Sequence, residues 1–451
     1  MERTVKGNVT PRTNKSEFLK GAAWIAGGGF IAKLIGALYR IPLTNLIGGY
    51  GIGLYQLVYP VYCLLLTVSA TGIPSSIAKL TAERIGNGES SMPLFKTAMK
   101  LFLLIGLAGS LLMMALAPAL SAAQGSGAVL GGYYALAPSV LLVSAISVFR
   151  GWFQGQNKMH PTALSEIAEQ AIKVGFGLLF AYLFRDNVER AVIFLLLSVS
   201  LSELFALCLM LFLFRRIPAP MQLEKKGGRV GIKTVLKLSI PVTLNSMLLP
   251  LSSLLDSVIA PRLLSVYAEN AVTLYGLFSG GAVTVISLPV SICYGIAAAS
   301  IPDVAAVGAD GDSRRTRGKI FYALGVTAAV ALPSAIGLYF LATPAAKLIF
   351  RSLSAQEQGV LSGLIRAYAI SAFTLSCTQT LSACLTAQGK PQYAAVSMAI
   401  AIVLKTLTYC LLLKNPKISV FGLAYATNLC YLVAFVLDLV YNLYITRRKK
   451  E

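Results

Sequence analysis

Two basic residues lie seven positions apart inside a stretch that is otherwise apolar enough to cross a bilayer. The stretch runs from Trp24 to Tyr50 (WIAGGGFIAKLIGALYRIPLTNLIGGY) and contains Lys33 and Arg40. Residues i and i+7 of an α-helix lie two turns apart on one face. A cation at the centre of a bilayer costs about 2.5–3.5 kcal/mol on insertion scales, so it usually faces a partner or a wet cavity. The spacing therefore predicts a helix that lines a cavity receiving an anion; neutralisation by acids on neighbouring helices is the alternative.

Other charged residues also fall inside apolar segments. Arg366 and Lys405 are the candidate cations of the second half of the chain, predicted to join a cationic cavity; the alternative is that they are buried against acids or extend to a membrane interface. Glu203 and Asp256 are isolated acids, and Asp438 is a third one. Each acid is predicted to be a coupling site for a proton or Na⁺, or a counter-ion to the cations.

A further group of charges shares one helical face. Glu166, Glu169, Gln170 and Lys173 follow the spacing i, i+3, i+4 and i+7. The simplest interpretation is an ion pair within one helix between Glu169 and Lys173, which are four residues apart. This face is expected to point into the protein interior, so Glu166 and Glu169 are also candidate coupling or counter-ion acids.

The composition indicates an integral membrane protein. Of the 451 residues, 56% are hydrophobic and 13% are charged, and the mean hydropathy is +0.72. Soluble domains carry about 25% charged residues. The formal net charge of +21 could suggest nucleic acid, but the basic residues fall in short loops and are not interleaved with stacking aromatics. This placement argues against nucleic-acid binding and is typical of a topology signal.

Residue types that support catalysis or metal binding are scarce. The seven cysteines all lie inside apolar segments and form no CxxC pair, and His160, in a loop, is the single histidine. Cysteines in such positions are typically small core residues rather than disulfides or metal ligands. The sequence therefore predicts no catalytic residue, no metal site and no enzymatic activity.

Twelve apolar segments of spanning length predict an all-α polytopic membrane protein. They cover residues 21–46, 53–80, 94–120, 132–153, 162–184, 191–214, 235–260, 271–301, 320–341, 360–387, 393–413 and 421–445. The 39 lysines and arginines concentrate at both termini and in alternate loops. By the positive-inside rule that side is cytoplasmic, so both termini are predicted to be cytoplasmic, with the basic N-terminal stretch an uncleaved lead-in.

The twelve segments divide into two sets of six. A polar, basic linker at 215–234 is predicted to join an N-terminal lobe, 1–214, to a C-terminal lobe, 235–451. FQGQNKMHPTA from Phe153 and AQGKPQYAA from Ala387 each place Gln-Gly, then Lys and Pro, before a new segment. These matches predict a parallel repeat about an axis along the membrane normal, a recurrent transporter plan with the substrate site between the lobes.

The repeat also bears on one of the isolated acids. The segment that contains Asp256 is the counterpart of the first segment, so Asp256 is expected to lie opposite Lys33 and Arg40.

Two motifs carry a resemblance to a known group of proteins. FRGWFQGQNKMHPTALSEIAEQ, from Phe149, and KLIGALYRIPLTNLIGGYGIGLYQLVYPVY, from Lys33, resemble the stage V sporulation protein B and polysaccharide-exporter group. This group belongs to the multidrug/oligosaccharidyl-lipid/polysaccharide (MOP) flippase superfamily, which includes the lipid II flippases. The resemblance covers most of the chain and implies two six-helix lobes that form a V-shaped, alternating-access transporter.

The resemblance also implies a substrate and a setting. A protein of this group would move a saccharide precursor linked to undecaprenyl diphosphate, such as lipid II or a polysaccharide repeat unit, across the bacterial cytoplasmic membrane. The chain differs from lipid II flippases, which carry an acid where Ile41 stands, further arginines on the second helix, and in many cases fourteen helices. A cationic site therefore carries over for Lys33 and Arg40 only.

The expected partners are the lipid-linked anionic saccharide and membrane lipids, for a monomer associated with the cell-envelope synthesis machinery. No cofactor is expected, and Na⁺, H⁺ or the membrane potential would drive transport. Three other functions stay open. A cation-coupled, MATE-like multidrug exporter would have an acid-dominated cavity, and a polytopic membrane enzyme would need catalytic residues on large aqueous loops. The third is a non-transporting assembly factor in envelope or spore biogenesis.

Overall fold

Long helices make up nearly all of the computed structural model, which describes residues 15–217, 232–309 and 312–448. In chain order the helices are α1 (Lys15–Leu66), α2 (Ile73–Gly86), α3 (Met92–Ala123), α4 (Leu130–Gly155), α5 (His160–Leu183), α6 (Val188–Arg216), α7 (Ile232–Ser246), α8 (Leu248–Leu264), α9 (Ala271–Gly276), α10 (Val283–Ala309), α11 (Ser313–Phe340), α12 (Ala342–Ile349), α13 (Ala355–Tyr368), α14 (Ile370–Ala387), α15 (Pro391–Leu412) and α16 (Phe421–Arg448). Short π-helical turns, η1 (Thr67–Thr71) and η3 (Leu277–Ala282), and a 3₁₀ turn, η2 (Gly127–Val129), join some of them.

Polar side chains fix several helix starts. The side chain of Asn187 accepts a hydrogen bond from the backbone N–H of Arg190 at the start of α6. Asp312 caps α11 in the same way. Ser354 and Glu357 form a reciprocal capping box at the start of α13. These residues satisfy N–H groups that the first turn of a helix leaves without partners.

The described helices account for the spans expected from the sequence. Eight helical stretches are long and apolar enough to cross a membrane, and a ninth forms if α13 and α14, which meet at 44°, are one bent span. The stretch 34–86 contains two of the expected segments in succession. Two expected segments are left. One corresponds to α5, which carries three charged residues, and the other to the pair of shorter helices α7 and α8, which are 15 and 17 residues long.

A break at Gly48 divides α1 into two arms. Gly48 has φ 71° and ψ −177°, a conformation that costs an L-residue with a Cβ much more than glycine. The chain reverses there, so that Arg40, before the break, and Tyr59, after it, line one cavity. The sequence predicted two separate helices in this region, and the structure joins them directly through this one residue.

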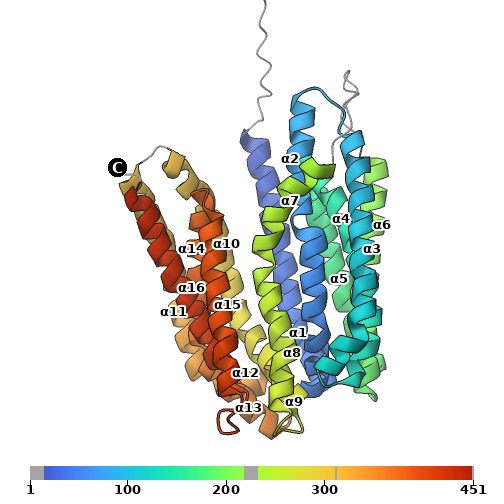
Figure 1. The fold of residues 1–451 in the computed structure, drawn as a ribbon, viewed down its shortest axis with the longest axis vertical. Coiled ribbons are helices and arrows are strands. Elements are labelled where there is room, and N and C mark those ends of the chain that lie inside the picture. Colours follow the sequence, from blue (N-terminus) through green and yellow to red (C-terminus); the bar gives the residue numbers. More distant parts are fainter. Residues whose placement is uncertain (1–14, 218–231, 310–311, 449–451) are drawn as a thin grey trace, which may run out of the picture.

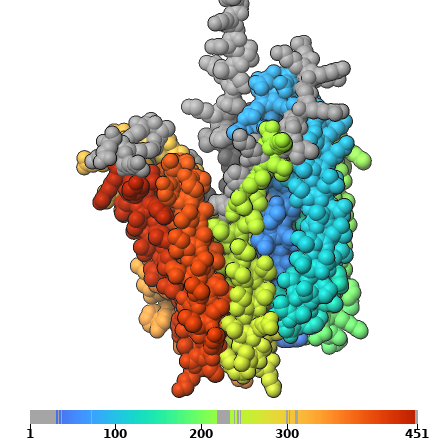
Figure 2. Space-filling model, in the orientation of Figure 1, coloured from blue at the N-terminus to red at the C-terminus, as the bar shows by residue number. Residues whose placement is uncertain are grey.

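The helices gather into two groups, α2–α6 and α10–α16, with α1 and α7–α9 between them (Figure 1). At the end that carries α9, α12 and α13, one hydrophobic core continues from Leu57 of α1 to Leu361 of α13. Toward the other end the core splits into a cluster around Trp152 and a separate one around Leu381. Figure 2 shows the two groups diverging toward the end where the C-terminus lies.

The closed end depends on glycines that let helix backbones touch. A Cβ at Gly53 of α1 would lie 2.3 Å from the carbonyl oxygen of Val272, and one at Gly276 would lie 2.6 Å from that of Gly49. Small residues permit such close packing of membrane helices. Gln56 of α1 adds a hydrogen bond of 2.8 Å to the carbonyl oxygen of Ser279.

The outer faces are apolar, as expected for a protein surrounded by lipid. Large exposed side chains include Leu104 of α3, Phe340 of α11 and Leu411 of α15, which are 66%, 71% and 71% exposed. The chain is therefore a multi-pass membrane protein, in agreement with the predicted fold class. The turn after α2, the start of α7 and the C-terminus share one end (Figure 1). This is the end predicted to be cytoplasmic, and the orientation stays a prediction.

The proposed lobe boundaries also stay predictions. Most of the predicted linker, 218–231, lies outside the described residues, and the flanking helices end at Arg216 and begin at Ile232. The predicted cytoplasmic N-terminal lead-in, as far as residue 14, also lies outside them.

We expect Gly53→Ala to destabilise the protein, because the added methyl group collides with the backbone of α9. Overpacking of this kind costs about 1–3 kcal/mol. Gly175→Ala in α5 is the matched control, since its Cβ meets no atom within 4 Å. The thermal unfolding midpoint in detergent should fall for Gly53→Ala and stay level or rise for Gly175→Ala. Equal midpoints would contradict the close contact between α1 and α9.

Candidate functional site

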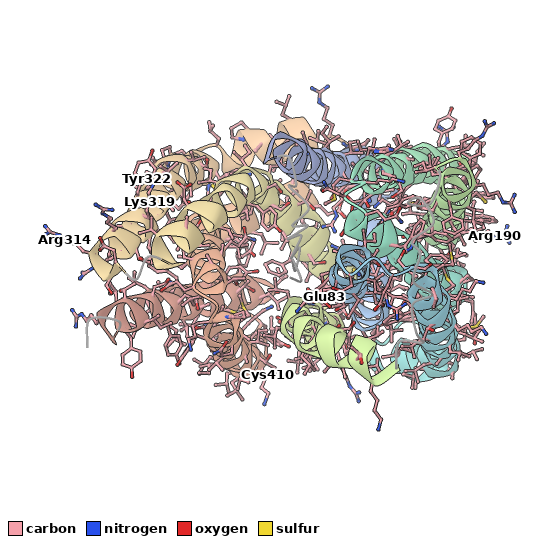
Figure 3. The ribbon with its side chains drawn as sticks, turned by 90° about the horizontal axis from the view of Figure 1, so that it is seen from above. Glu83, Arg190, Arg314, Lys319, Tyr322 and Cys410 are labelled. Carbon is pink, nitrogen blue, oxygen red and sulfur yellow. The ribbon has the colours of Figure 1, made fainter. Side chains whose placement is uncertain are left out.

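A cavity of about 350 Å³ lies between α1 and the α10–α16 group. Its lining comes from α1 on one side and from α8, α9, η3, α10, α13, α15 and α16 on the others. Figure 3 looks down from the C-terminal end, with α2–α6 on one side of the view and α10–α16 on the other. The size falls in the range of small-molecule sites, about 300–1,000 Å³.

Arg40 is a cation of this cavity without an acidic partner. The residue is half-buried on the first arm of α1 and lines the cavity. Its Nη1 atom lies 3.5 Å from the hydroxyl oxygen of Thr284 of α10, a long and weak hydrogen bond. None of the ion pairs within the described residues includes Arg40. Its guanidinium group therefore keeps most of its donors available to an anion.

Lys33 keeps its predicted place on the first arm of α1. Its backbone is helical, seven residues before Arg40. The side chain of Lys33 lies outside the described residues, so its role in the cavity stays a prediction.

Lys405 and Asp256 form a buried ion pair in the wall of the cavity that faces α1. Nζ of Lys405 on α15 contacts Oδ2 of Asp256 on α8, and it also donates a hydrogen bond of 3.0 Å to the hydroxyl oxygen of Ser252. The two side chains are 6% and 11% exposed. Asp256 and Arg40 line the same cavity, but the contact of Asp256 is with Lys405.

The ion pair determines the net charge of the cavity wall. Lys405 and Asp256 cancel, so the charge in excess among the described lining residues is that of Arg40. The other oxygen of Asp256, Oδ1, is buried without a hydrogen-bond partner. Removing either member alone would leave an uncompensated charge in a poorly solvated wall.

Arg366 does not reach the cavity. It lies exposed in the last turn of α13 and donates a hydrogen bond of 2.8 Å to the hydroxyl oxygen of Thr343 on α12. The prediction that this cation lines the cavity is not met, because its helix presents Tyr368 rather than Arg366 to the cavity.

A second polar cluster fills the interior of the α2–α6 group. Glu169 of α5 pairs with Arg150 of α4 at 3.0 Å, and Arg150 also donates to the hydroxyl oxygen of Ser165. The predicted pair between Glu169 and Lys173 is wrong, because α4 brings a guanidinium group that satisfies Glu169 from a neighbouring helix. Lys173 lies half-buried close by, within electrostatic range of Glu169.

The predicted acids Glu203 and Glu166 belong to this cluster and not to the cavity lining. Glu203 of α6 is 3% exposed and accepts a hydrogen bond of 3.1 Å from the hydroxyl group of Tyr62. Glu166 lies within electrostatic range of Arg150. Their predicted part in ion coupling stays a prediction.

Sequence reasoning missed the tyrosines of the cavity. Tyr59, Tyr275, Tyr368 and Tyr431 line it from four different elements. Tyr59 stacks against Tyr55 with ring centroids 5.0 Å apart, one turn away on α1. The spacing of tyrosines on α1, next to Pro60, was the one available signal. Amphipathic rings of this kind offer an apolar face and a polar hydroxyl group.

Within the described residues, no group of three or more His, Cys, Asp or Glu side chains could hold a metal ion. The described residues form a half-buried cavity with a cation at its wall, between α1 and the α10–α16 group. The geometry places the protein among polytopic membrane transporters.

Comparison with known proteins agrees with this class. Residues 18–307 match the family model described as "Polysaccharide biosynthesis protein", and the chain belongs to this family. Stage V sporulation protein B of Bacillus subtilis (strain 168) is 27% identical over 64% of this chain, and the match spans 58% of that relative's length.

Two further comparisons, one by sequence and one with a solved structure, identify the fold. The lipid II flippase MurJ of Bacillus subtilis (strain 168) is 21% identical over 93% of this chain and 81% of its own length. An inward-facing structure of a multidrug resistance MATE transporter superposes with a TM-score of 0.79 at 15% identity, covering 93% of this chain and 95% of that one. The fold is thus that of the MOP superfamily, as the motifs at Lys33–Tyr62 and Phe149–Gln170 predicted.

The buried ion pair can be tested by a double-mutant cycle. Asp256→Asn and Lys405→Met should each lower the thermal unfolding midpoint, because each leaves one charge unpaired, at a cost of about 3–5 kcal/mol. The double variant should recover much of the loss. Additive effects of the two substitutions would show that Asp256 and Lys405 do not interact.

Proposed function

We propose that this protein is a flippase that moves a saccharide precursor linked to a lipid diphosphate across the bacterial cytoplasmic membrane. One observation carries the proposal: the cavity between α1 and the α10–α16 group holds Arg40 without an acidic partner in the described residues. A lipid diphosphate carries about two negative charges, and a cation in a medium of low dielectric constant attracts it more strongly than a surface cation would. Arginine also binds phosphate oxygens in a bidentate manner.

The shape of the molecule supports loading from the side predicted to be cytoplasmic. The helix groups diverge toward the end that carries the C-terminus, and the opposite end is closed by the contact between α1 and α9. A precursor made on the cytoplasmic side would enter between the groups and meet Arg40. Rocking of the groups about the closed end would then expose the site to the other side.

The cavity wall also fits the saccharide part of such a ligand. The tyrosines present hydroxyl groups together with apolar ring faces, and Gln56 and Ser253 add neutral polar groups. Neutral donors and acceptors of this kind bind sugar hydroxyl groups without requiring a charge. The family match and the resemblance to the lipid II flippase support the same substrate class.

The second candidate is a multidrug exporter, which the superposition with a MATE transporter favours. The acid available to a cationic drug among the lining residues is Asp256, and its charge is already neutralised by Lys405. A cationic drug would therefore have to displace Lys405 from Asp256 and tolerate Arg40 nearby. The charge balance of the cavity favours an anion.

Arg40→Ala should weaken binding of diphosphate lipids by at least tenfold, since a hydrogen-bonded charge pair contributes about 1.5–3 kcal/mol. Native mass spectrometry of the purified protein with lipid II, bare undecaprenyl diphosphate and a cationic dye would measure it. Lys33→Ala is expected to weaken binding as well. Arg366→Ala removes an arginine outside the cavity and should leave binding unchanged.

The cationic dye in the same experiment tests the second candidate, the multidrug exporter. Binding of the dye, with lipid binding that is indifferent to Arg40→Ala, would contradict the flippase and support the exporter.

A further inference from the structure

A second cavity, the outer groove, lies between the neighbouring helices α10 and α11 and has a volume of about 210 Å³. Three of its lining residues on α10 follow the spacing i, i+4 and i+7, and three on α11 follow i, i+3 and i+7. Each set therefore shares one helical face. The six residues are Ile296, Ser300 and Asp303 of α10 and Lys319, Tyr322 and Val326 of α11.

The outer groove changes from charged to apolar along its length. Asp303 and Lys319 form an ion pair between the two helices at one end of it. Ile296 lies seven residues before Asp303, and Val326 lies seven residues after Lys319. Seven residues of an α-helix span about 10 Å. The groove is thus amphipathic in the way that a phospholipid is, with charges at one end and hydrocarbon beyond them.

The charged end of the groove lies where lipid headgroups are expected. The residues that follow Asp303 and Lys319 in the sequence belong to the core cluster around Leu381, at the end where the two helix groups diverge. Basic side chains near the end of a membrane span extend to the headgroups. The first turns of α11 carry three of them, Arg314, Arg315 and Arg317.

The groove opens on the outer face of the molecule. Figure 3 shows Lys319, Tyr322 and Arg314 at the edge that is farthest from α2–α6. Tyr322 is 71% exposed. An exposed aromatic residue on a membrane-spanning helix, close to a charged end, is typical of contact with the lipid interface. The molecule available to fill the outer groove is therefore a lipid of the surrounding membrane.

The charged end offers one charge of each sign. Nζ of Lys319 lies 3.1 Å from Oδ2 of Asp303, and the side chains are 45% and 65% exposed. This contact uses one of the three donors of the ammonium group and one oxygen of the carboxylate, so both groups keep bonding capacity. An exposed ion pair contributes little to stability. A ligand with complementary charges can therefore bind both groups without a large penalty.

The arginines of α11 do not give the groove a net charge. Arg315 pairs with Asp312, and Arg317 lies over the ring of Phe321. Neither these two nor Arg314 belongs to the described lining of the groove. A purely anionic headgroup would be attracted by Lys319 and repelled by Asp303, whereas a headgroup with both charges would be attracted by both residues.

We propose that the outer groove binds a phospholipid whose headgroup carries a phosphate and a primary ammonium group, as in phosphatidylethanolamine. The phosphate accepts a hydrogen bond from Lys319, and the ammonium group donates one to Asp303. An acyl chain of the same lipid lies along Ile296 and Val326.

This lipid site is separate from the main cavity. α10 lines that cavity through Val283, which is twenty residues before Asp303. Among the described residues, the linings of the main cavity and of the outer groove share no member. The inference therefore does not depend on what the main cavity carries.

Native mass spectrometry of the delipidated full chain in detergent would measure the binding of three phospholipids with identical acyl chains. Phosphatidylethanolamine carries both charges, phosphatidylcholine has an ammonium group without N–H donors, and phosphatidylglycerol has no cation. We expect the natural protein to bind phosphatidylethanolamine about three- to fivefold more tightly than either of the others, the range for partly exposed charge pairs.

Variants of the pair separate the two contacts. Asp303→Asn keeps the shape of the side chain without its charge and should remove the preference for phosphatidylethanolamine. Lys319→Met should weaken binding of all three lipids, because each carries the phosphate. Glu83→Gln is the matched control, since Glu83 forms a similarly exposed ion pair with Lys79 on α2, and it should retain the preference.

Three results would overturn the proposal. The natural protein could bind phosphatidylethanolamine and phosphatidylcholine equally well, or it could bind phosphatidylglycerol more tightly than phosphatidylethanolamine. The third result is a preference for phosphatidylethanolamine that Asp303→Asn leaves unchanged.

Discussion

The cost of an ionised side chain inside a membrane governs this structure. A charge at the centre of a bilayer costs about 2.5–3.5 kcal/mol on insertion scales, so each one must be neutralised or used. The described residues neutralise Arg150 with Glu169 and Lys405 with Asp256, each pair joining two different helices. Arg40 remains with one weak hydrogen bond to a hydroxyl group, in the cavity between α1 and the α10–α16 group. Arg40, an interior cation without an ion pair in the described residues, is thus placed where a ligand can supply an anion.

Close backbone contacts fix where that charge lies. Gly48 breaks α1 and brings its two arms to one cavity wall, while Gly53 and Gly276 let α1 pack directly on α9. The closed end forms a common core for both helix groups, and their separate cores begin toward the other end. Alternating access requires two helix groups that rock against each other as rigid bodies. A shared contact at one end and separate cores at the other suit that motion.

The sequence could predict those features that depend on local pattern. Hydropathy located the spans, and two intramembrane cations on one helical face predicted a cavity, which Arg40 lines. Contacts between distant residues could not be predicted. The partner of Glu169 is Arg150, on another helix, and the partner of Lys405 is Asp256, 149 residues away. Arg366 lies outside the cavity because the orientation of α13 depends on packing and not on its own sequence. The joined arms of α1 depend on one φ angle at Gly48.

The most direct test of the account is transport in proteoliposomes. A fluorescent, short-chain lipid diphosphate carrying a saccharide would be placed in one leaflet, and its arrival in the other would be read with a membrane-impermeant reagent. The account predicts movement by the natural protein and by Arg366→Ala, and strongly reduced movement by Arg40→Ala. Movement of a cationic dye without movement of the diphosphate lipid, or full activity of Arg40→Ala, would contradict it.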